Sequence, residues 1–126
     1  MPDRARVKAF VDAVVGGDHV GAIADYYHED ASKQENLMEP RRGRDVLMAH
    51  EAAVLKRVSM HTHPDPVVLV DGDHVVVHWT FDATTTDGVT RRLNELALQR
   101  WVGDRIAEER FVYDTGSAWQ VVEDNN

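Results

Sequence analysis

Glutamate and histidine side chains are the residues of this chain whose types suit proton transfer. Three glutamates, Glu35, Glu95 and Glu109, and one histidine, His78, are the candidates for this chemistry. A carboxylate in an apolar cavity resists ionisation, and neighbouring carboxylates strengthen that resistance by repulsion. If these side chains meet, one glutamate could act as a general acid or base near neutral pH, and His78 could hold the opposite charge. Such a set could move a proton next to a carbonyl group or add water to a polarised bond.

Two of these glutamates have a second interpretation. Glu95 and Glu109 could lie at the wet mouth of a cavity, or they could pair with Arg100 and Arg110. In either case they would be solvated groups without a catalytic role.

A histidine pair is the second pattern that could carry chemistry. His61 and His63 stand two residues apart, a spacing that puts both rings on one face of a strand, although Pro64 indicates that this strand is bent. Imidazole rings at this spacing could bind a metal ion. The chain has no cysteine and no compact His/Glu motif beside the pair. The sequence therefore predicts no metal site.

Two other polar features have both structural and functional interpretations. His50 falls on the apolar face of a predicted helix, which indicates a hydrogen-bonded core histidine or a cavity-lining one. Arg41, Arg42 and Arg44 come just before or at the start of that helix. They could attract an anion to its N-terminus or form an ordinary solvated loop.

The composition narrows the class of protein. The chain has 126 residues, with 14 basic and 22 acidic side chains and a formal net charge of −8. This length predicts a single domain, residues 1–126, and the acidic balance argues against a nucleic-acid partner. The longest apolar run, residues 67–70, is too short to cross a membrane. Without cysteines or a signal-peptide pattern, the chain is expected to be cytoplasmic and to need no disulfide, zinc–thiolate or iron–sulfur group.

The elements that must position these residues begin with helices. Apolar residues at helical spacing over 7–15 form one stripe, and Gly16-Gly17 ends the helix that this stripe predicts. Asp18 is placed to cap a second helix over 20–27. After a polar stretch, the same spacing predicts a third helix over 44–58.

The second half of the chain has the pattern of strands. Residues rich in Val, Thr, Trp and Phe are separated by Asp-Gly and Gly-Asp turns that are typical of hairpins. Strands joined by such short turns are antiparallel. Helices followed by an antiparallel meander predict an α+β fold with the helices against one sheet face. The predicted strands are 67–70, 74–83, 90–102 and 105–114.

These elements and several short motifs together resemble the nuclear transport factor 2-like superfamily, and within it the SnoaL-like polyketide cyclase and ketosteroid isomerase group. The motifs are Gly17-Asp18, residues 27–31 (Tyr-His-Glu-Asp-Ala), Gly43-Arg44-Asp45, Asp71-Gly72-Asp73, and the runs 94–101 and 108–114. The resemblance implies a curved antiparallel sheet wrapped around three N-terminal helices, which is a cone-shaped α+β barrel with a central cavity. Because one fold hosts many activities, the resemblance implies the architecture more strongly than the reaction.

The resemblance assigns a place to individual residues. Residues 31–43 are similar to the ketosteroid isomerase segment that carries the proton-shuttling aspartate, and Glu35 falls on that aspartate. The two oxyanion donors of those isomerases align with Phe10 and Ala97, which cannot donate a hydrogen bond. A steroid isomerase mechanism is therefore not expected.

Two other mechanisms of the superfamily also lack a part here. The Asp-Arg-Asp triad of limonene epoxide hydrolases falls on Thr80, His78 and Phe111, which cannot replace it. His61 matches a histidine of scytalone-dehydratase-like members, but its usual acidic partner on the first helix is missing. The comparison implies that the cavity wall contains Phe10, Tyr27, His50, His61, Thr80, Ala97, Phe111 and Tyr113.

These observations lead to two functional hypotheses from different classes. The first is a cofactor-independent isomerase, cyclase or dehydratase that acts on a small apolar molecule through Glu35, His78, Glu95 and Glu109. The second is a non-catalytic ligand-binding or accessory protein of the same fold. The sequence also predicts a homodimer, because an apolar outer sheet face would otherwise be exposed to water. That face is expected to carry Val75, Val77, Trp79, Phe81, Leu96 and Leu98.

Overall fold

A computed structural model describes residues 1–123, which form three helices and eight strands. The first helix, α1 (Arg4–Val15), begins where the Asp3 carboxylate accepts a hydrogen bond from the Ala5 amide at 2.7 Å. The second, α2 (His19–Tyr26), begins where Asp18 accepts one from the Gly21 amide at 3.1 Å. The third helix is α3 (Arg44–Arg57). The helices and their order agree with the sequence prediction.

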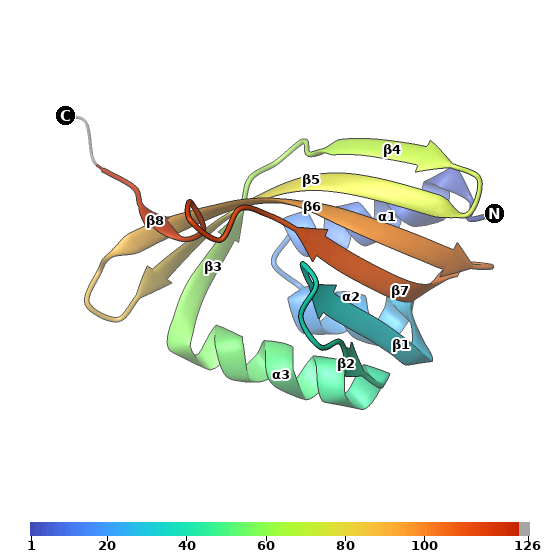
Figure 1. Cartoon of the computed structure of the whole chain (residues 1–126), viewed down its shortest axis with the longest axis horizontal. Coiled ribbons are helices and arrows are strands. Elements are labelled where there is room, and N and C mark those ends of the chain that lie inside the picture. Colours follow the sequence, from blue (N-terminus) through green and yellow to red (C-terminus); the bar gives the residue numbers. More distant parts are fainter. Residues whose placement is uncertain (124–126) are drawn as a thin grey trace.

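One sheet contains all the strands (Figure 1). The spatial order is β2-β1-β7-β6-β5-β3, with β4 paired to β5 and β8 paired to β6. The strands are β1 (Tyr27–Glu35), β2 (Arg41–Arg42), β3 (Val58–Thr62), β4 (Val67–Asp71), β5 (His74–Thr85), β6 (Thr90–Val102), β7 (Arg105–Val112) and β8 (Gln120–Val121).

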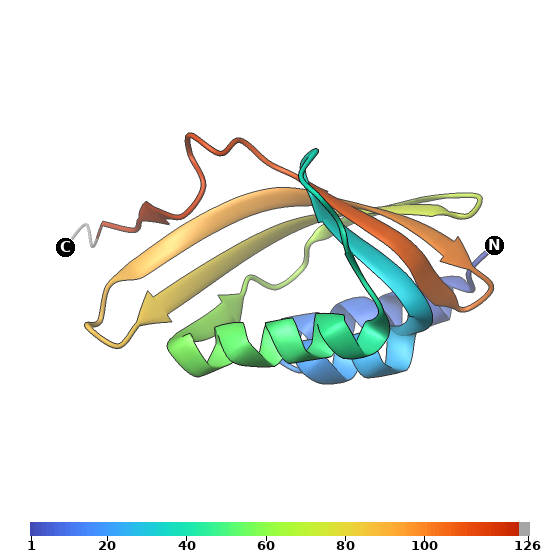
Figure 2. The same cartoon turned by 60° about the horizontal axis from the view of Figure 1, so that its bottom comes forward.

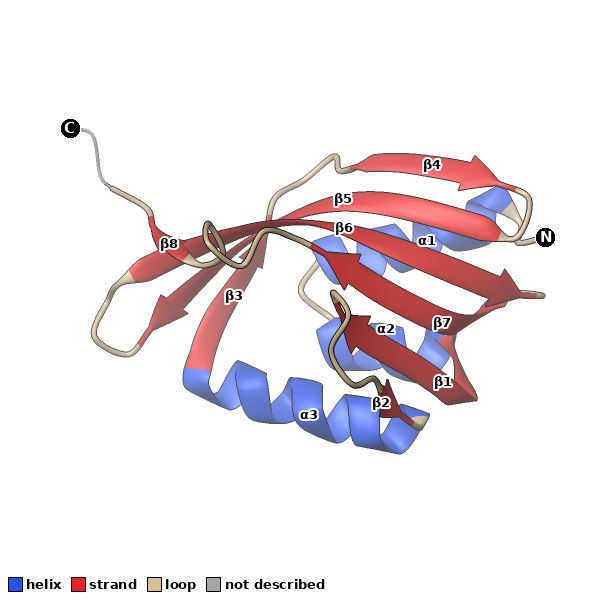
Figure 3. Ribbon diagram, viewed as in Figure 1, coloured by secondary structure: helices blue, strands red, loops and turns tan. Residues whose placement is uncertain are grey.

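The α+β architecture expected from the sequence is confirmed, with one change in the sheet. The central pairings β5–β6 and β6–β7 are antiparallel, but β1 runs parallel to β7, so the sheet is mixed. It curls strongly, and the helices lie on its concave side (Figure 2; helices in blue in Figure 3). The space between the sheet and the helices is where the core and the cavity form.

The register between β5 and β6 decides which side chains face the helices. Trp79 stands opposite Glu95 and Val77 opposite Ala97. Directly opposite residues of an antiparallel pair share a face of the sheet. Trp79 and Val77 are buried against the helices, so Glu95 also points inward.

The sequence-based orientation of β5 is therefore wrong. His78 stands opposite Leu96, and Thr80 opposite Asn94, so both lie on the convex face. Val75, Val77 and Trp79, which were expected to cover that convex face, are instead buried in the core. The physical reason is that the apolar side chains of β5 must cover the apolar stripe of α1.

Phe10 lies at the centre of the core. Its ring makes edge contacts with the rings of Tyr26, Tyr27, Trp79 and Trp101 at centroid distances of 5.5 to 6.4 Å. The side chain is 2% exposed. Such edge contacts add to the stabilisation from apolar burial.

None of the helices within residues 1–123 is long and apolar enough to cross a membrane.

Candidate functional site

A cavity of about 210 Å³ lies between the helices and the concave face of the sheet. This is smaller than the roughly 300–1,000 Å³ of pockets for drug-sized ligands, so the cavity suits a smaller molecule. Its wall is largely apolar and aromatic. The titratable residues in this wall are His19, Tyr27, Lys33, Glu35, Arg41, His50, Glu51, Glu95, Glu109 and Tyr113.

Most of the residues expected at the cavity line it. Three of the four candidate catalytic residues do so, and each comes from a different strand: Glu35 from β1, Glu95 from β6 and Glu109 from β7. The expected wall residues found there are Phe10, Tyr27, His50, Phe111 and Tyr113. Their functional roles stay predictions.

Four expected residues lie elsewhere. His78 and Thr80 are on the convex face of the sheet, and His61 is an exposed residue of β3. Ala97 does face inward, but its short side chain is wholly buried in the core beneath the cavity wall. His78 therefore cannot exchange a proton with the cavity glutamates.

Glu109 is held by a buried hydrogen-bond chain. The Tyr27 hydroxyl donates to its Oε1 atom, and the Gln99 amide donates to its Oε2 atom at 2.7 Å. The Trp101 indole N–H in turn donates to the Gln99 oxygen at 3.0 Å. Burial, together with the adjacent Glu109 carboxylate, raises the pKa of the Tyr27 hydroxyl. These bonds fix the position of Glu109 inside the protein. Glu109 is therefore not a solvated surface group, which was its second interpretation from the sequence.

Glu95 is a cavity carboxyl group whose surroundings favour its neutral form. The residue lines the cavity and is only 7% exposed. Burial, reinforced by the negative charges of Glu35 and Glu109, raises its pKa to about 9. At neutral pH Glu95 is therefore a carboxylic acid that can donate a hydrogen bond into the cavity.

The raised pKa of Glu95 predicts a dependence of stability on pH. In the unfolded chain Glu95 ionises near its ordinary pKa, whereas in the folded protein it keeps its proton until about pH 9. Its contribution to the free energy of unfolding is thus lost as the pH rises between these two values. Glu95→Gln removes that loss, so we expect its stability advantage over wild type to grow from pH 5 to pH 8. The slope should approach at most about 1.4 kcal/mol per pH unit.

Urea unfolding at several pH values measures this difference. Glu29→Gln, at an exposed position of β1, is the matched control and should follow the wild-type profile. Parallel profiles for Glu95→Gln and wild type would show that Glu95 ionises normally in the folded protein.

Glu35 has a different environment at the end of β1. Burial raises its pKa, but the Tyr113 hydroxyl and the positive charges of Lys33 and Arg41 act in the opposite direction. Burial and the Glu35 charge in turn raise the pKa of Tyr113. Two carboxyl groups in one cavity therefore differ in proton affinity, which is the condition for one to act as a base and the other as an acid.

Lys33, His19 and Glu51 are cavity residues that the sequence analysis did not identify, and Arg41, considered there for anion binding, also lines the cavity. Lys33 lies two residues before Glu35 on β1, so strand alternation brings both to the inner face. That alternation would have identified Lys33 if the strand had been recognised. His19 Nδ1 lies 3.9 Å from the Glu51 carboxylate, and burial lowers the pKa of His19. His50 lies at the rim, where burial and the charge of Arg41 lower its pKa.

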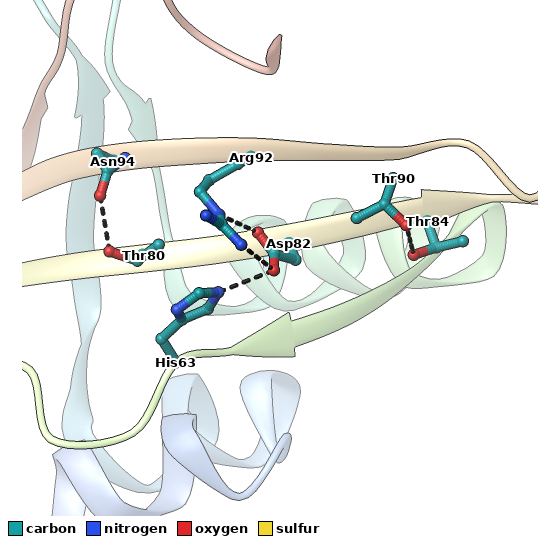
Figure 4. Close-up of polar contacts among 7 residues, drawn as sticks. All are labelled: His63, Thr80, Asp82, Thr84, Thr90, Arg92 and Asn94. Atoms are coloured by element: carbon teal, nitrogen blue, oxygen red, sulfur yellow. Dashed lines mark hydrogen bonds and ion pairs between the residues drawn. The ribbon is translucent and has the colours of Figure 1, made fainter. Parts of the chain in front are cut away.

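A separate polar cluster lies on the face of the sheet opposite the cavity (Figure 4). Arg92 donates two hydrogen bonds to the Asp82 carboxylate at 2.7 and 3.0 Å, and His63 lies 2.8 Å from it. The bonds from Arg92 and His63 lower the pKa of Asp82 to about 2. Thr80 donates to Asn94 at 2.7 Å in the same row of opposite residues. Within residues 1–123 no three His, Cys, Asp or Glu side chains are grouped as metal ligands.

A curled mixed sheet with helices on its concave side and a cavity between them defines the nuclear transport factor 2-like fold. A family model described as SnoaL-like domain matches residues 7–109. The chain belongs to this SnoaL-like family. Comparison with curated proteins finds no match.

Solved structures share this fold over most of the chain. A candidate SnoaL-like polyketide cyclase from Mesorhizobium loti has 24% identity and a TM-score of 0.75, covering 90% of this chain and 100% of that chain. An LEH-like epoxide hydrolase from M. tuberculosis has 16% identity and a TM-score of 0.74, covering 90% of this chain and 83% of that chain. TerC, co-crystallised with polyporic acid, has 18% identity and a TM-score of 0.73, covering 89% and 91%. At these identities the similarity establishes the fold.

Proposed function

We propose that this protein binds a small, largely apolar organic molecule in its cavity and catalyses a cofactor-independent proton transfer on it. The observation that carries the proposal is the pair of carboxyl groups, Glu35 and Glu95, that line one cavity in different surroundings: Glu35 beside Tyr113 and Lys33, and Glu95 almost fully buried. Glu35 is the base and the neutral Glu95 is the acid. Glu95 thus takes the place that the sequence analysis gave to His78.

The proposed reaction acts on a carbonyl compound with an adjacent C–H bond. Glu35 removes the proton from carbon, the C–H electron pair forms a carbon–carbon double bond, and the carbonyl electron pair moves to oxygen. The Glu95 carboxylic acid donates a hydrogen bond to that oxygen, where negative charge develops. Return of the proton from Glu35 to another carbon would give isomerisation. Its transfer to a departing β-hydroxyl group would give dehydration with release of water. Attack of the enolate carbon on a second carbonyl group, whose oxygen then takes the proton, would give cyclisation.

The wider setting of the cavity supports this proposal. The apolar part of the wall lowers the local dielectric constant, which strengthens the effect of each polar group on the reacting atoms. Glu109 does not enter the reaction, because both of its oxygens already accept hydrogen bonds from Tyr27 and Gln99. The names polyketide cyclase and epoxide hydrolase, and the co-crystallised polyporic acid, belong to relatives of this fold and favour a small organic ligand here as well.

The test uses β-tetralone, a small apolar ketone with acidic α-hydrogens. In heavy water, NMR measures the rate at which these hydrogens are replaced by deuterium. We expect the protein to accelerate the exchange in a saturable way, above the rate with the same concentration of free acetate. Saturable binding of β-tetralone without acceleration would instead favour the second hypothesis, a non-catalytic ligand-binding protein.

We also propose that two copies associate through the convex face of the sheet. Six apolar residues lie on this face over β4 to β7, and five of them are at least 42% exposed. Such a continuous apolar surface favours burial against a second copy. The residues are Val67, Leu69, Val76, Leu96, Leu98 and Val112, which replace most of the set expected from the sequence.

Sedimentation at micromolar protein tests the association. Wild type should have about twice the chain mass of 14.2 kDa. Leu98→Lys places a charge in the middle of the face and should give a monomer. Leu37→Lys, in an exposed turn outside the face, is the control and should leave the mass unchanged. A monomeric wild type would contradict the proposal.

A further inference from the structure

Lys33 places a positive charge in a cavity wall that also carries four carboxyl groups and one other permanent cation, Arg41. Its Nζ atom lies 3.9 Å from Glu109 Oε1, 5.3 Å from the centre of the Tyr27 ring and 5.4 Å from the centre of the Phe111 ring. The side chain is 22% exposed. The two aromatic faces and the Glu109 charge hold the ammonium group at the cavity wall.

The contact with Glu109 does not use the hydrogen-bonding capacity of Lys33. A distance of 3.9 Å is longer than an N–H···O hydrogen bond. Both Glu109 oxygens already accept bonds from Tyr27 and Gln99. An ammonium group has three N–H donors, and that of Lys33 makes no hydrogen bond to any of residues 1–123. These donors are available to a molecule in the cavity.

We propose that Lys33 is a specificity-determining residue that selects ligands with an acidic oxygen, namely a phenol, an enol or an enolisable ketone. This inference rests on the proposed function, because it assumes that the cavity binds a ligand. The Lys33 ammonium group would donate to that oxygen and stabilise it when it becomes negative. A charge-assisted hydrogen bond of this kind is stronger in an apolar cavity than in water.

The other charges of the cavity narrow the ligand class. Lys33 already occupies the faces of Tyr27 and Phe111, where an organic cation would bind. Glu35 and Glu109 would repel a ligand that carries a permanent carboxylate. A ligand whose oxygen is neutral on entry and gains negative charge only beside Lys33 does not compete with Lys33 for the aromatic faces. It also avoids repulsion by the carboxylates. Weakly acidic phenols and enols have this property.

Two probes of similar size separate the contribution of Lys33 from simple apolar binding. Para-nitrophenol carries an acidic hydroxyl, and its phenolate has a visible absorption band. Nitrobenzene has the same ring and nitro group without the hydroxyl. We expect wild type to bind para-nitrophenol more tightly and to increase the bound phenolate fraction above that in buffer at the same pH.

Lys33→Met removes the charge at nearly constant length. It should weaken para-nitrophenol binding by about 10–100-fold, the range for a lost charge-assisted hydrogen bond. Nitrobenzene binding should change by less than about threefold. Lys33→Arg should keep the preference for para-nitrophenol. Lys56→Met, the same change at an exposed lysine outside the cavity, should behave as wild type.

Each outcome decides one of the two proposals. If Lys33→Met binds both probes as wild type does, the Lys33 inference is wrong, while the proposed ligand cavity stands. If wild type binds neither probe, the proposed function fails and the inference fails with it. If Lys33→Met does not fold, wild type alone gives the answer, because a bound phenolate fraction no higher than that in buffer would overturn the inference.

Discussion

Glu35→Gln is expected to lower the rate of β-tetralone deuterium exchange by about 10²–10⁴-fold, the usual contribution of a general base. The substitution keeps the shape of the side chain but removes the group that accepts the proton. Folding stability should stay equal or rise, because burial raises the pKa of Glu35 and thus disfavours its charged form. Exchange measured by NMR and urea unfolding of the same sample separate the two effects.

Two control variants make this prediction specific. Glu29→Gln changes an exposed glutamate of the same strand and should keep the wild-type rate. Glu95→Gln keeps a hydrogen-bond donor at the acid position and should lose less activity than Glu35→Gln. If Glu35→Gln retains the wild-type rate within a factor of about three, Glu35 is not the base and the reaction scheme is wrong.

Phe10→Ala is expected to lower the free energy of unfolding by about 3–5 kcal/mol. Phe10 is the central residue of the α1 stripe, and its ring contacts four other aromatic rings. Truncation removes these contacts and leaves an empty space beside the cavity. The neighbouring aromatic rings cannot fill that space. Urea unfolding at constant pH measures the loss.

Phe10 also lines the cavity, which gives a second possible result. A loss below about 1 kcal/mol, accompanied by changed affinity for nitrobenzene, would mean that Phe10 mainly forms the ligand wall. Val46→Ala, at a 54% exposed position of α3, is the control and should lower stability much less than Phe10→Ala.

The helices and hairpins could be predicted because their signals are local. The apolar spacing of α1 and the Asp18 cap act over a few residues. The Asp87-Gly88 turn, where Gly88 has a φ of 84°, likewise determines the hairpin of β5 and β6 within its own sequence. The family resemblance added the cavity and the place of Glu35 in it.

The strand β1 could not be predicted from such signals. Its residues, Tyr27–Glu35, are mostly polar and alternate poorly, and its main partner is the parallel strand β7, far along the chain. Parallel pairing has no hairpin turn that marks it in the sequence. Because β1 was missed, Lys33 was missed as a neighbour of Glu35 in the cavity.

The orientation of the central strands was also decided by tertiary structure. Alternation correctly grouped Val75, Val77 and Trp79 on one face of β5, but alternation does not say which face the helices cover. Packing of that face against α1 turned His78 outward and, through the β5–β6 register, Glu95 inward.

The chemistry of the cavity depends most on the tertiary structure. The sequence supplied three glutamates of suitable type, but they lie on three strands and are 14 or more residues apart along the chain. Only folding brings their charges together in an apolar space, and this proximity and burial raise the pKa of Glu95 to about 9. Proton affinity depends on the surroundings of a group in space. The sequence by itself therefore determined which residues could transfer a proton, and the fold decided which of them share a cavity and which of those stays protonated.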